Sequence, residues 1–154
     1  LNTNNVAQAI EKLINENEKT LKELEAMRQE KIEQLVNLFS QEKTTINQLN
    51  VIKRIEKTDA EILKQVAYKL RNRDEKTLIV LGTKSEDKIH LIVTLSDDLT
   101  ATGLNASKLV KEVSPIIQGG GGGQPSLATA GGKNRDGLEK AIEKIVEVAL
   151  SQAN

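Results

Sequence analysis

Apolar residues recur every three or four positions along the first quarter of the chain, and this spacing predicts one long helix from Thr3 to Phe39. No glycine or proline interrupts it, and good helix formers fill the remaining positions. The apolar stripe is narrow and is broken by Asn17, Thr20 and Arg28. A helix of about 35 residues spans roughly 50 Å and is not stable alone, so we expect a coiled-coil-like pairing with another helix or with a second copy.

The hydrophobic pattern changes after a polar boundary at residues 40–45. Short apolar runs there predict strands within 46–56, over 77–83 and 89–95, and near 127–130, with a polar hairpin turn at 84–88.

Helix-period stretches alternate with these strands. Thr58 or Asp59 is expected to cap a helix that ends near Arg73, and Asn105 to cap another that runs to about Ile117. A last helix is expected over 138–150. The order predicts an α/β fold, a mixed sheet flanked by helices, and we expect a helical segment over 1–40 and a globular domain over 41–154.

Five consecutive glycines, residues 119–123, interrupt this pattern within the sequence IIQGGGGGQPSLATAGGK. Glycine leaves the main chain bare, so another molecule can approach it closely. We expect a loop that holds a ligand or lets two backbones cross. The alternative from composition alone is a flexible linker. The patterned flanks, a helix before the run and a strand after it, favour a loop embedded in a domain.

Composition excludes several functions. The formal net charge is zero, so there is no overall electrostatic case for nucleic acid or membrane. With one Phe, one Tyr and no Trp, the core must be aliphatic, and we expect no aromatic stacking platform for bases. The absence of cysteine is compatible with a cytoplasmic protein. No apolar run reaches the roughly 18 residues that a membrane span requires, so no membrane partner is expected.

Known catalytic patterns do not fit the chain. The dinucleotide fingerprint fails because Gln124 stands at its third glycine and the run follows a helix, and the Walker pattern fails because Asn134 follows Gly132-Lys133. His90, the sole histidine, is expected to be an exposed or edge-strand residue, and the Asp97-Asp98 pair to form a turn or cap. We expect no catalytic residue and no metal site.

Basic residues cluster locally despite the neutral total. Seven basic residues against three acidic ones lie between Lys53 and Arg73, and four more, at 108, 111, 133 and 135, flank the glycines in sequence. A basic face beside bare main chain suits a phosphate backbone. A solvated helix face is an equally good explanation of the charges.

The stretches GLNASKLVKEVSPIIQ, GGGGGQP-SLATAGGKN and LIVLGT…KIHLIVTLSDDL resemble the C-terminal domain of alanyl-tRNA synthetase, a module related to the DHH-associated domain of certain phosphoesterases. The resemblance covers about residues 46–150, and the long helix is similar to the family's helical subdomain. Gln124-Pro125 favours the synthetase branch, since phosphoesterases usually have a histidine there. The family commonly has Gly at Gln118 and Arg at Gln124, so any role of that arginine is missing here.

This resemblance implies a module that recognises the elbow of alanine tRNA and helps aminoacylation and editing domains share one tRNA. It also implies upstream synthetase domains with ATP, magnesium and zinc sites; no cofactor is expected in this chain. A structural or dimerisation module acting through the long helix and the substrate-binding half of a DHH phosphoesterase remain alternatives. The candidate nucleic-acid-binding residues are Gly119, Gly120, Gly121, Gly122, Gly123, Gln124, Lys133, Lys64 and Arg71.

Overall fold

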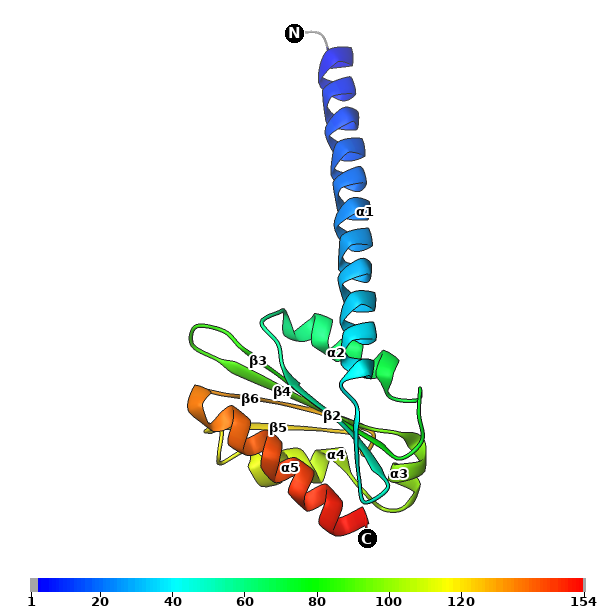
Figure 1. Cartoon of the computed structure of the whole chain (residues 1–154). Coiled ribbons are helices and arrows are strands. Elements are labelled where there is room, and N and C mark those ends of the chain that lie inside the picture. Colours follow the sequence, from blue (N-terminus) through cyan, green and yellow to red (C-terminus); the bar gives the residue numbers. More distant parts are fainter. Residues whose placement is uncertain (1–2, 154) are drawn as a thin grey trace.

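The computed structural model describes residues 3–153 as a long helix followed by one mixed six-stranded sheet with helices on both faces (Figure 1). This arrangement confirms the predicted α/β class. The strand order is β1-β2-β3-β4-β6-β5. The elements in chain order are α1 (Thr3–Gln41), β1 (Thr44–Ile46), β2 (Leu49–Ile55), α2 (Ala60–Leu70), β3 (Thr77–Lys84), β4 (Ile89–Leu95), α3 (Asp97–Ala101), α4 (Ala106–Val113), β5 (Gly119–Gly123), β6 (Leu127–Gly132), the 3-10 turn η1 (Arg135–Gly137) and α5 (Leu138–Ala153).

The centre of the sheet is buried on both faces. Strand β3 pairs in parallel with β2, through the crossover helix α2, and antiparallel with β4, while all other pairs are antiparallel. Leu78 and Val80 of β3 enter one hydrophobic cluster, and Ile79 and Leu81 enter the other. A strand with two buried faces reads as a continuous apolar run, which explains the pattern at 77–83.

Different helices cover the two faces (Figure 1). Helices α4 and α5 pack on one face, with Leu109 and Ile145 among the buried side chains of the larger cluster. Helix α2 and the last turns of α1 pack on the other face, with Leu63, Val66 and Phe39 in the smaller cluster. The β5–β6 edge is backed by α4 on the first face, whereas α2 lies over β3 and β4 on the second.

Helix α1 projects away from the sheet for most of its length (Figure 1). Its large apolar side chains between residues 6 and 27 are 48% to 67% exposed. Farther along the same stripe, Ile32, Leu35 and Phe39 are buried against α2 and the sheet. An ion pair between Glu33 and Lys69 joins the two helices, and its hydrogen bond lowers the pKa of Glu33. The division of the chain at residue 40 stays a prediction.

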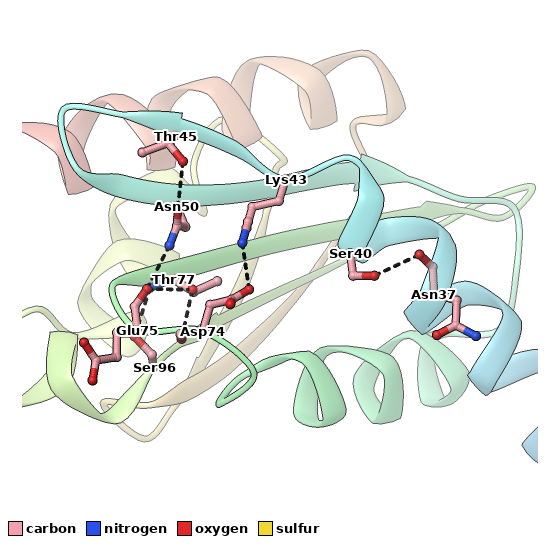
Figure 2. Close-up of polar contacts among 9 residues, drawn as sticks. All are labelled: Asn37, Ser40, Lys43, Thr45, Asn50, Asp74, Glu75, Thr77 and Ser96. Atoms are coloured by element: carbon pink, nitrogen blue, oxygen red, sulfur yellow. Dashed lines mark hydrogen bonds and ion pairs between the residues drawn. The ribbon is translucent and has the colours of Figure 1, made fainter.

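Polar contacts fix the chain where it leaves α1 and enters the sheet (Figure 2). Lys43 forms an ion pair with Asp74 at 2.9 Å, which ties the segment after α1 to the loop before β3. The Asn50 side chain accepts from the Thr45 hydroxyl at 2.8 Å and donates to the backbone carbonyl of Glu75 at 2.9 Å. These contacts link β1 to β2 and hold both against the loop that leads into β3.

Two predicted helices are too long at their C-terminal ends. Helix α2 ends at Leu70 rather than near Arg73, and α4 ends at Val113 rather than near Ile117. Pro115 has no N–H to continue the ladder of α4, and Gln118 then adopts a left-handed conformation with φ 51°.

The predicted caps are correct. Asp59 accepts the Glu61 N–H at 2.9 Å at the start of α2, and Asn105 accepts the Lys108 N–H at 3.2 Å at the start of α4. The expectation of a turn or cap at Asp97-Asp98 is met only in part: both residues lie in the first turn of α3, whose N-cap is Ser96, and the Asp98 carboxylate accepts the N–H groups of Lys76 and Leu99. His90 is partly exposed but lies on β4, which is paired on both sides, so the edge-strand alternative is wrong.

Candidate nucleic-acid interface

The five glycines form strand β5 at the edge of the sheet, and the predicted loop is wrong. Each glycine faces one residue of β6, from Gly119 opposite Gly132 to Gly123 opposite Ala128. Main-chain pairing creates this strand without any side-chain pattern, so hydrophobic periodicity could not reveal it. Four of the five glycines are exposed and Gly122 is partly buried. The bare main chain expected from the sequence is therefore present, but on a strand.

Alternate positions of β5 require glycine. A Cβ on Gly119, Gly121 or Gly123 would lie 1.8, 2.2 or 2.5 Å from a backbone oxygen of β6, separations that real Cβ atoms essentially never show. A Cβ on Gly120 would meet nothing within 4 Å. The two strands approach each other too closely for side chains at the three odd positions.

The outer edge of β5 offers main-chain donors. Gln124 lies just beyond the strand and donates its N–H to the Leu127 carbonyl at 2.9 Å. Hydrogen-bonded positions alternate along an antiparallel ladder, so Gly120 and Gly122 bond to β6, while Gly121 and Gly123 direct their N–H groups to the open edge. Within residues 3–153, no backbone bond outside the ladder takes either of these N–H groups. They are the kind of donor that contacts phosphate oxygens.

The turn between β5 and β6 is held by neighbouring elements. Ala106 at the start of α4 donates its N–H to the Pro125 carbonyl at 2.8 Å. The Ser126 carbonyl accepts the Leu95 N–H at 2.9 Å and the Thr94 hydroxyl at 2.7 Å. These bonds rule out the flexible-linker interpretation of the glycine-rich segment.

A groove of about 610 Å³ separates α2 from the β5–β6 edge, and we call it the α2–β5 groove. Its helical wall comes from one side of α2 and the residue after it: Glu61, Lys64, Gln65, Tyr68, Lys69 and Arg71. Its sheet side comes from the two edge strands and their turn: Gly122, Gly123, Gln124, Ser126, Leu127 and Thr129. Predicted residues from distant parts of the sequence therefore share one surface.

The floor of the α2–β5 groove is the part of the sheet that α2 does not cover. Ala128 and Ala130 of β6 are buried in the larger cluster on the opposite face. Because successive residues of a strand point to opposite faces, Leu127 and Thr129 face the groove. A second, adjoining hollow of about 440 Å³ shares Lys64 and Thr129 with it and extends the surface along β5 to Gly120 and across to His90.

The cations near this surface are not equivalent. No ion pair or side-chain hydrogen bond in the described residues involves Lys64, whereas Lys69 is paired with Glu33. The guanidinium of Arg71 donates to the Leu95 carbonyl at 3.0 Å and pairs with Asp97, so it anchors the end of α2 to the end of β4. Of the two predicted cations that line the groove, Lys64 and Arg71, only Lys64 therefore has a charge that the contacts of residues 3–153 leave available to a ligand.

Helix α4 brings a further cation to the opposite side of β5. A Cβ on Gly122 would lie 3.9 Å from Cε of Lys111 and 3.9 Å from the Ser107 hydroxyl. Lys111 is exposed, and the described contacts give it no ion-pair partner. Strand β5 therefore lies between Lys64 on one side and Lys111 on the other.

Two predicted site residues lie apart from both hollows. Gly119 and Lys133 are at the other end of the β5–β6 pair, where Lys133 donates its N–H to the Ile117 carbonyl at 3.0 Å.

Tyr68 was not among the site residues predicted from the sequence. Its side chain is 67% exposed within the wall of the α2–β5 groove. Its spacing was a usable signal, because it follows Lys64 by four residues and precedes Arg71 by three, opposite the buried stripe of α2.

Structural contacts lower the pKa of two carboxylates, Asp98 on α3 and Glu139 on α5. Partial burial raises the pKa of Asp98, but hydrogen bonds from the Ser96 hydroxyl and the backbone N–H groups of Lys76, Asp98 and Leu99 outweigh it and hold the pKa below its ordinary value. A hydrogen bond from Lys84 lowers the pKa of Glu139. Over residues 3–153, no three His, Asp or Glu side chains gather closely enough to bind a metal ion, and no helix could cross a membrane.

The sequence and the fold both have relatives. Residues 47–151 match the DHHA1 domain family. Alanine–tRNA ligase of Bacteroides fragilis is 44% identical over 149 residues, which are 96% of this chain and 17% of the relative. That of Bacteroides thetaiotaomicron is 45% identical over 142 residues, 92% of this chain and 16% of the relative. The chain thus spans only 16% to 17% of the length of these curated relatives.

Solved structures with a similar fold include a domain of the same enzyme family as the sequence relatives. The crystal structure of the C-Ala domain from Aquifex aeolicus alanyl-tRNA synthetase matches with a TM-score of 0.65 and 26% identity, over 71% of this chain and 97% of that one. The DHH domain of a member of a ribosomal protein family shares the fold, with a TM-score of 0.57 and 14% identity over 79% of this chain and 31% of that one. The chain belongs to the DHHA1 domain family, in the branch formed by the C-terminal C-Ala region of alanyl-tRNA synthetases.

Proposed function

We propose that this chain is the tRNA-docking module of an alanine–tRNA ligase. It binds the elbow of alanine tRNA in the cytoplasm, so that upstream aminoacylation and editing domains act on one tRNA. The family relationship supports a synthetase, and the relatives named above are alanine–tRNA ligases. They favour this function over the substrate-binding half of a phosphoesterase.

One observation carries the proposal: an exposed strand without side chains lies between two cations that have no ion-pair partner within residues 3–153. The bare main chain of β5 allows a nucleic-acid contour to approach closely. The outward N–H groups of Gly121 and Gly123 suit phosphate oxygens, and Lys64 and Lys111 supply charge on either side. Because the net charge is zero, this local arrangement rather than long-range attraction provides the affinity.

A salt titration with alanine tRNA tests the proposal. Each phosphate contact made by a lysine adds roughly one unit to the slope of log affinity against log salt. Lys64→Ala should weaken binding and lower the magnitude of this slope by about 1. Lys140→Ala is the matched control, because Lys140 is an exposed lysine on α5, on the opposite face of the sheet, without an ion-pair partner in the described contacts. Arg71 is unsuitable for this test, since its removal would also break the anchor to Leu95 and Asp97.

Two outcomes would contradict the proposal. The first is no salt-sensitive binding to tRNA at low ionic strength. The second is binding that Lys64→Ala and Lys140→Ala reduce equally, because a general charge effect would then explain the affinity.

A second function, self-association through α1, is favoured by the exposed stripe of that helix. Ile14, Leu21 and Leu24 are 53% to 60% exposed and continue the stripe that is buried farther along at Ile32 and Leu35. Paired helices bury such a stripe. We expect a second copy of α1 to cover it, which makes the module a homodimer.

Sedimentation equilibrium over a concentration series tests this association. The variant with Leu21→Glu and Leu24→Glu should dissociate at concentrations where the native chain is dimeric. The variant with Gln8→Glu and Asn15→Glu adds the same charge away from the stripe and should remain dimeric. A native chain that is monomeric at every concentration would exclude the dimer.

A further inference from the structure

Tyr68 has an exposed aromatic ring that the fold does not use. It is the single tyrosine of the chain and is 67% exposed on α2. The apolar stripe of α2 that builds the core consists of other residues, including Leu63, Val66 and Leu70. No hydrogen bond within residues 3–153 engages the Tyr68 hydroxyl. Packing within this chain therefore gives no reason for an aromatic residue at this position.

The surroundings of Tyr68 suit a nucleotide. The ring is in the wall of the α2–β5 groove, one helical turn after the unpaired Lys64, and residues at this spacing are neighbours on a helix surface. The sheet side of the groove presents Gly122 and Gly123, which have no side chains, together with Thr129. The volume of about 610 Å³ is that of a small-molecule site rather than of a cleft for a duplex.

The geometry points to Tyr68 as a stacking platform for one exposed nucleobase of the bound RNA, with Lys64 on the phosphate of the same or the next nucleotide. This inference rests on the proposed function and specifies what enters the groove: the open face of an unpaired base or of the last pair in a stack, not the side of a continuous helix. Aromatic side chains stack on such faces, whereas the bases inside a helix are already stacked.

Mutation separates stacking from charge. Tyr68→Ala should weaken binding to alanine tRNA about tenfold. It should leave the salt slope unchanged, because no phosphate contact is lost. Tyr68→Phe is the matched control: it keeps the ring and should bind within about twofold of the native chain. Lys64→Ala should lower the slope in the same experiment. Urea unfolding of Tyr68→Ala should match that of the native chain, since the side chain is exposed.

The single tyrosine also provides a direct probe. Incorporation of 3-fluorotyrosine gives one ¹⁹F resonance, which should move upfield when a base stacks on the ring at saturating tRNA. If Tyr68→Ala binds as tightly as the native chain, or the resonance does not move at saturation, the stacking inference is wrong even where the Lys64→Ala effect upholds the docking function. If the native chain does not bind tRNA at all, both fail.

Discussion

The two classes of glycine in β5 predict opposite effects of the same substitution. In Gly121→Ala, the new Cβ would lie 2.2 Å from the Thr129 carbonyl oxygen and 2.5 Å from Cα of Ala130. These are backbone atoms of the paired strand, and they cannot turn aside as the end of a flexible side chain can. In Gly120→Ala, the new Cβ meets nothing within 4 Å, and Gly120 is not among the positive-φ glycines.

The expected magnitudes follow from these contacts. Overpacking against backbone costs about 1–3 kcal/mol, and Gly121→Ala should be at the upper end because β5 must move away from β6. For a chain of this size, about 3 kcal/mol lowers the melting temperature by roughly 6–12 °C. Gly120→Ala should be neutral or stabilising by about 0.5 kcal/mol, since alanine reduces the entropy of the unfolded chain.

Urea unfolding monitored by circular dichroism measures both variants, with the native chain alongside. The chain has no tryptophan whose fluorescence could report unfolding, so far-ultraviolet ellipticity is the appropriate probe. Equal stability of the two variants would refute the close-approach argument for β5. A separate tRNA titration of Gly120→Ala should show weaker binding without lost stability, because its methyl group covers main chain that the proposed ligand approaches.

Three further predictions concern stability. Gln118→Gly should stabilise the chain by about 0.5–1 kcal/mol, measured by urea unfolding, because Gln118 has φ 51° and glycine adopts this conformation without strain; a loss of stability would contradict this reasoning. Asp98→Asn should lower stability at pH 7, and this difference from the native chain should shrink as the pH falls below about 4 in a pH series of unfolding midpoints: the folded-state pKa of Asp98 is lowered, so its contribution is fully present above the unfolded pKa and is lost as the pH falls through the folded pKa. A difference between Asp98→Asn and the native chain that is the same at every pH of the series would argue against this origin. Phe39→Ala should cost about 3–5 kcal/mol because Phe39 is 0% exposed, and a cost below 1 kcal/mol in the same assay would show that the end of α1 is not part of the core.

Elements with their own hydrophobic period could be predicted from sequence. Strands β3 and β4 read as apolar runs because both faces are buried, and Asp59 and Asn105 indicated the helices that they cap. Strand β5 could not be recognised, because glycine has no side chain and the strand exists only through bonds to β6. The helix boundary at Val113 was missed because the apolar pattern continues through Ile116 and Ile117 after the ladder has stopped.

The groove depends on strand order, which local patterns do not contain. Strand β6 inserts between β4 and β5, so Thr129 comes next to the sheet positions that α2 leaves uncovered. The sequence identified Lys64 and Gly122 separately, but their common surface requires this order. The sequence also predicted Lys64 and Arg71 equally as ligand-binding cations, because it shows only their charge. In the structure, the carboxylate of Asp97 and the Leu95 carbonyl already bind Arg71.

Because the last turns of α1 are buried in the core, the helix is a rigid spacer of fixed length. The helix runs without a break from the turn that contains Phe39 out to Thr3, about 58 Å at 1.5 Å per residue. Whatever holds its distal end therefore fixes the distance and the rotational setting at which the groove meets its ligand. Removing one residue from the exposed part would turn the distal end by about 100°, whereas removing seven would shorten the reach by about 10 Å and leave the orientation within about 20° of the original.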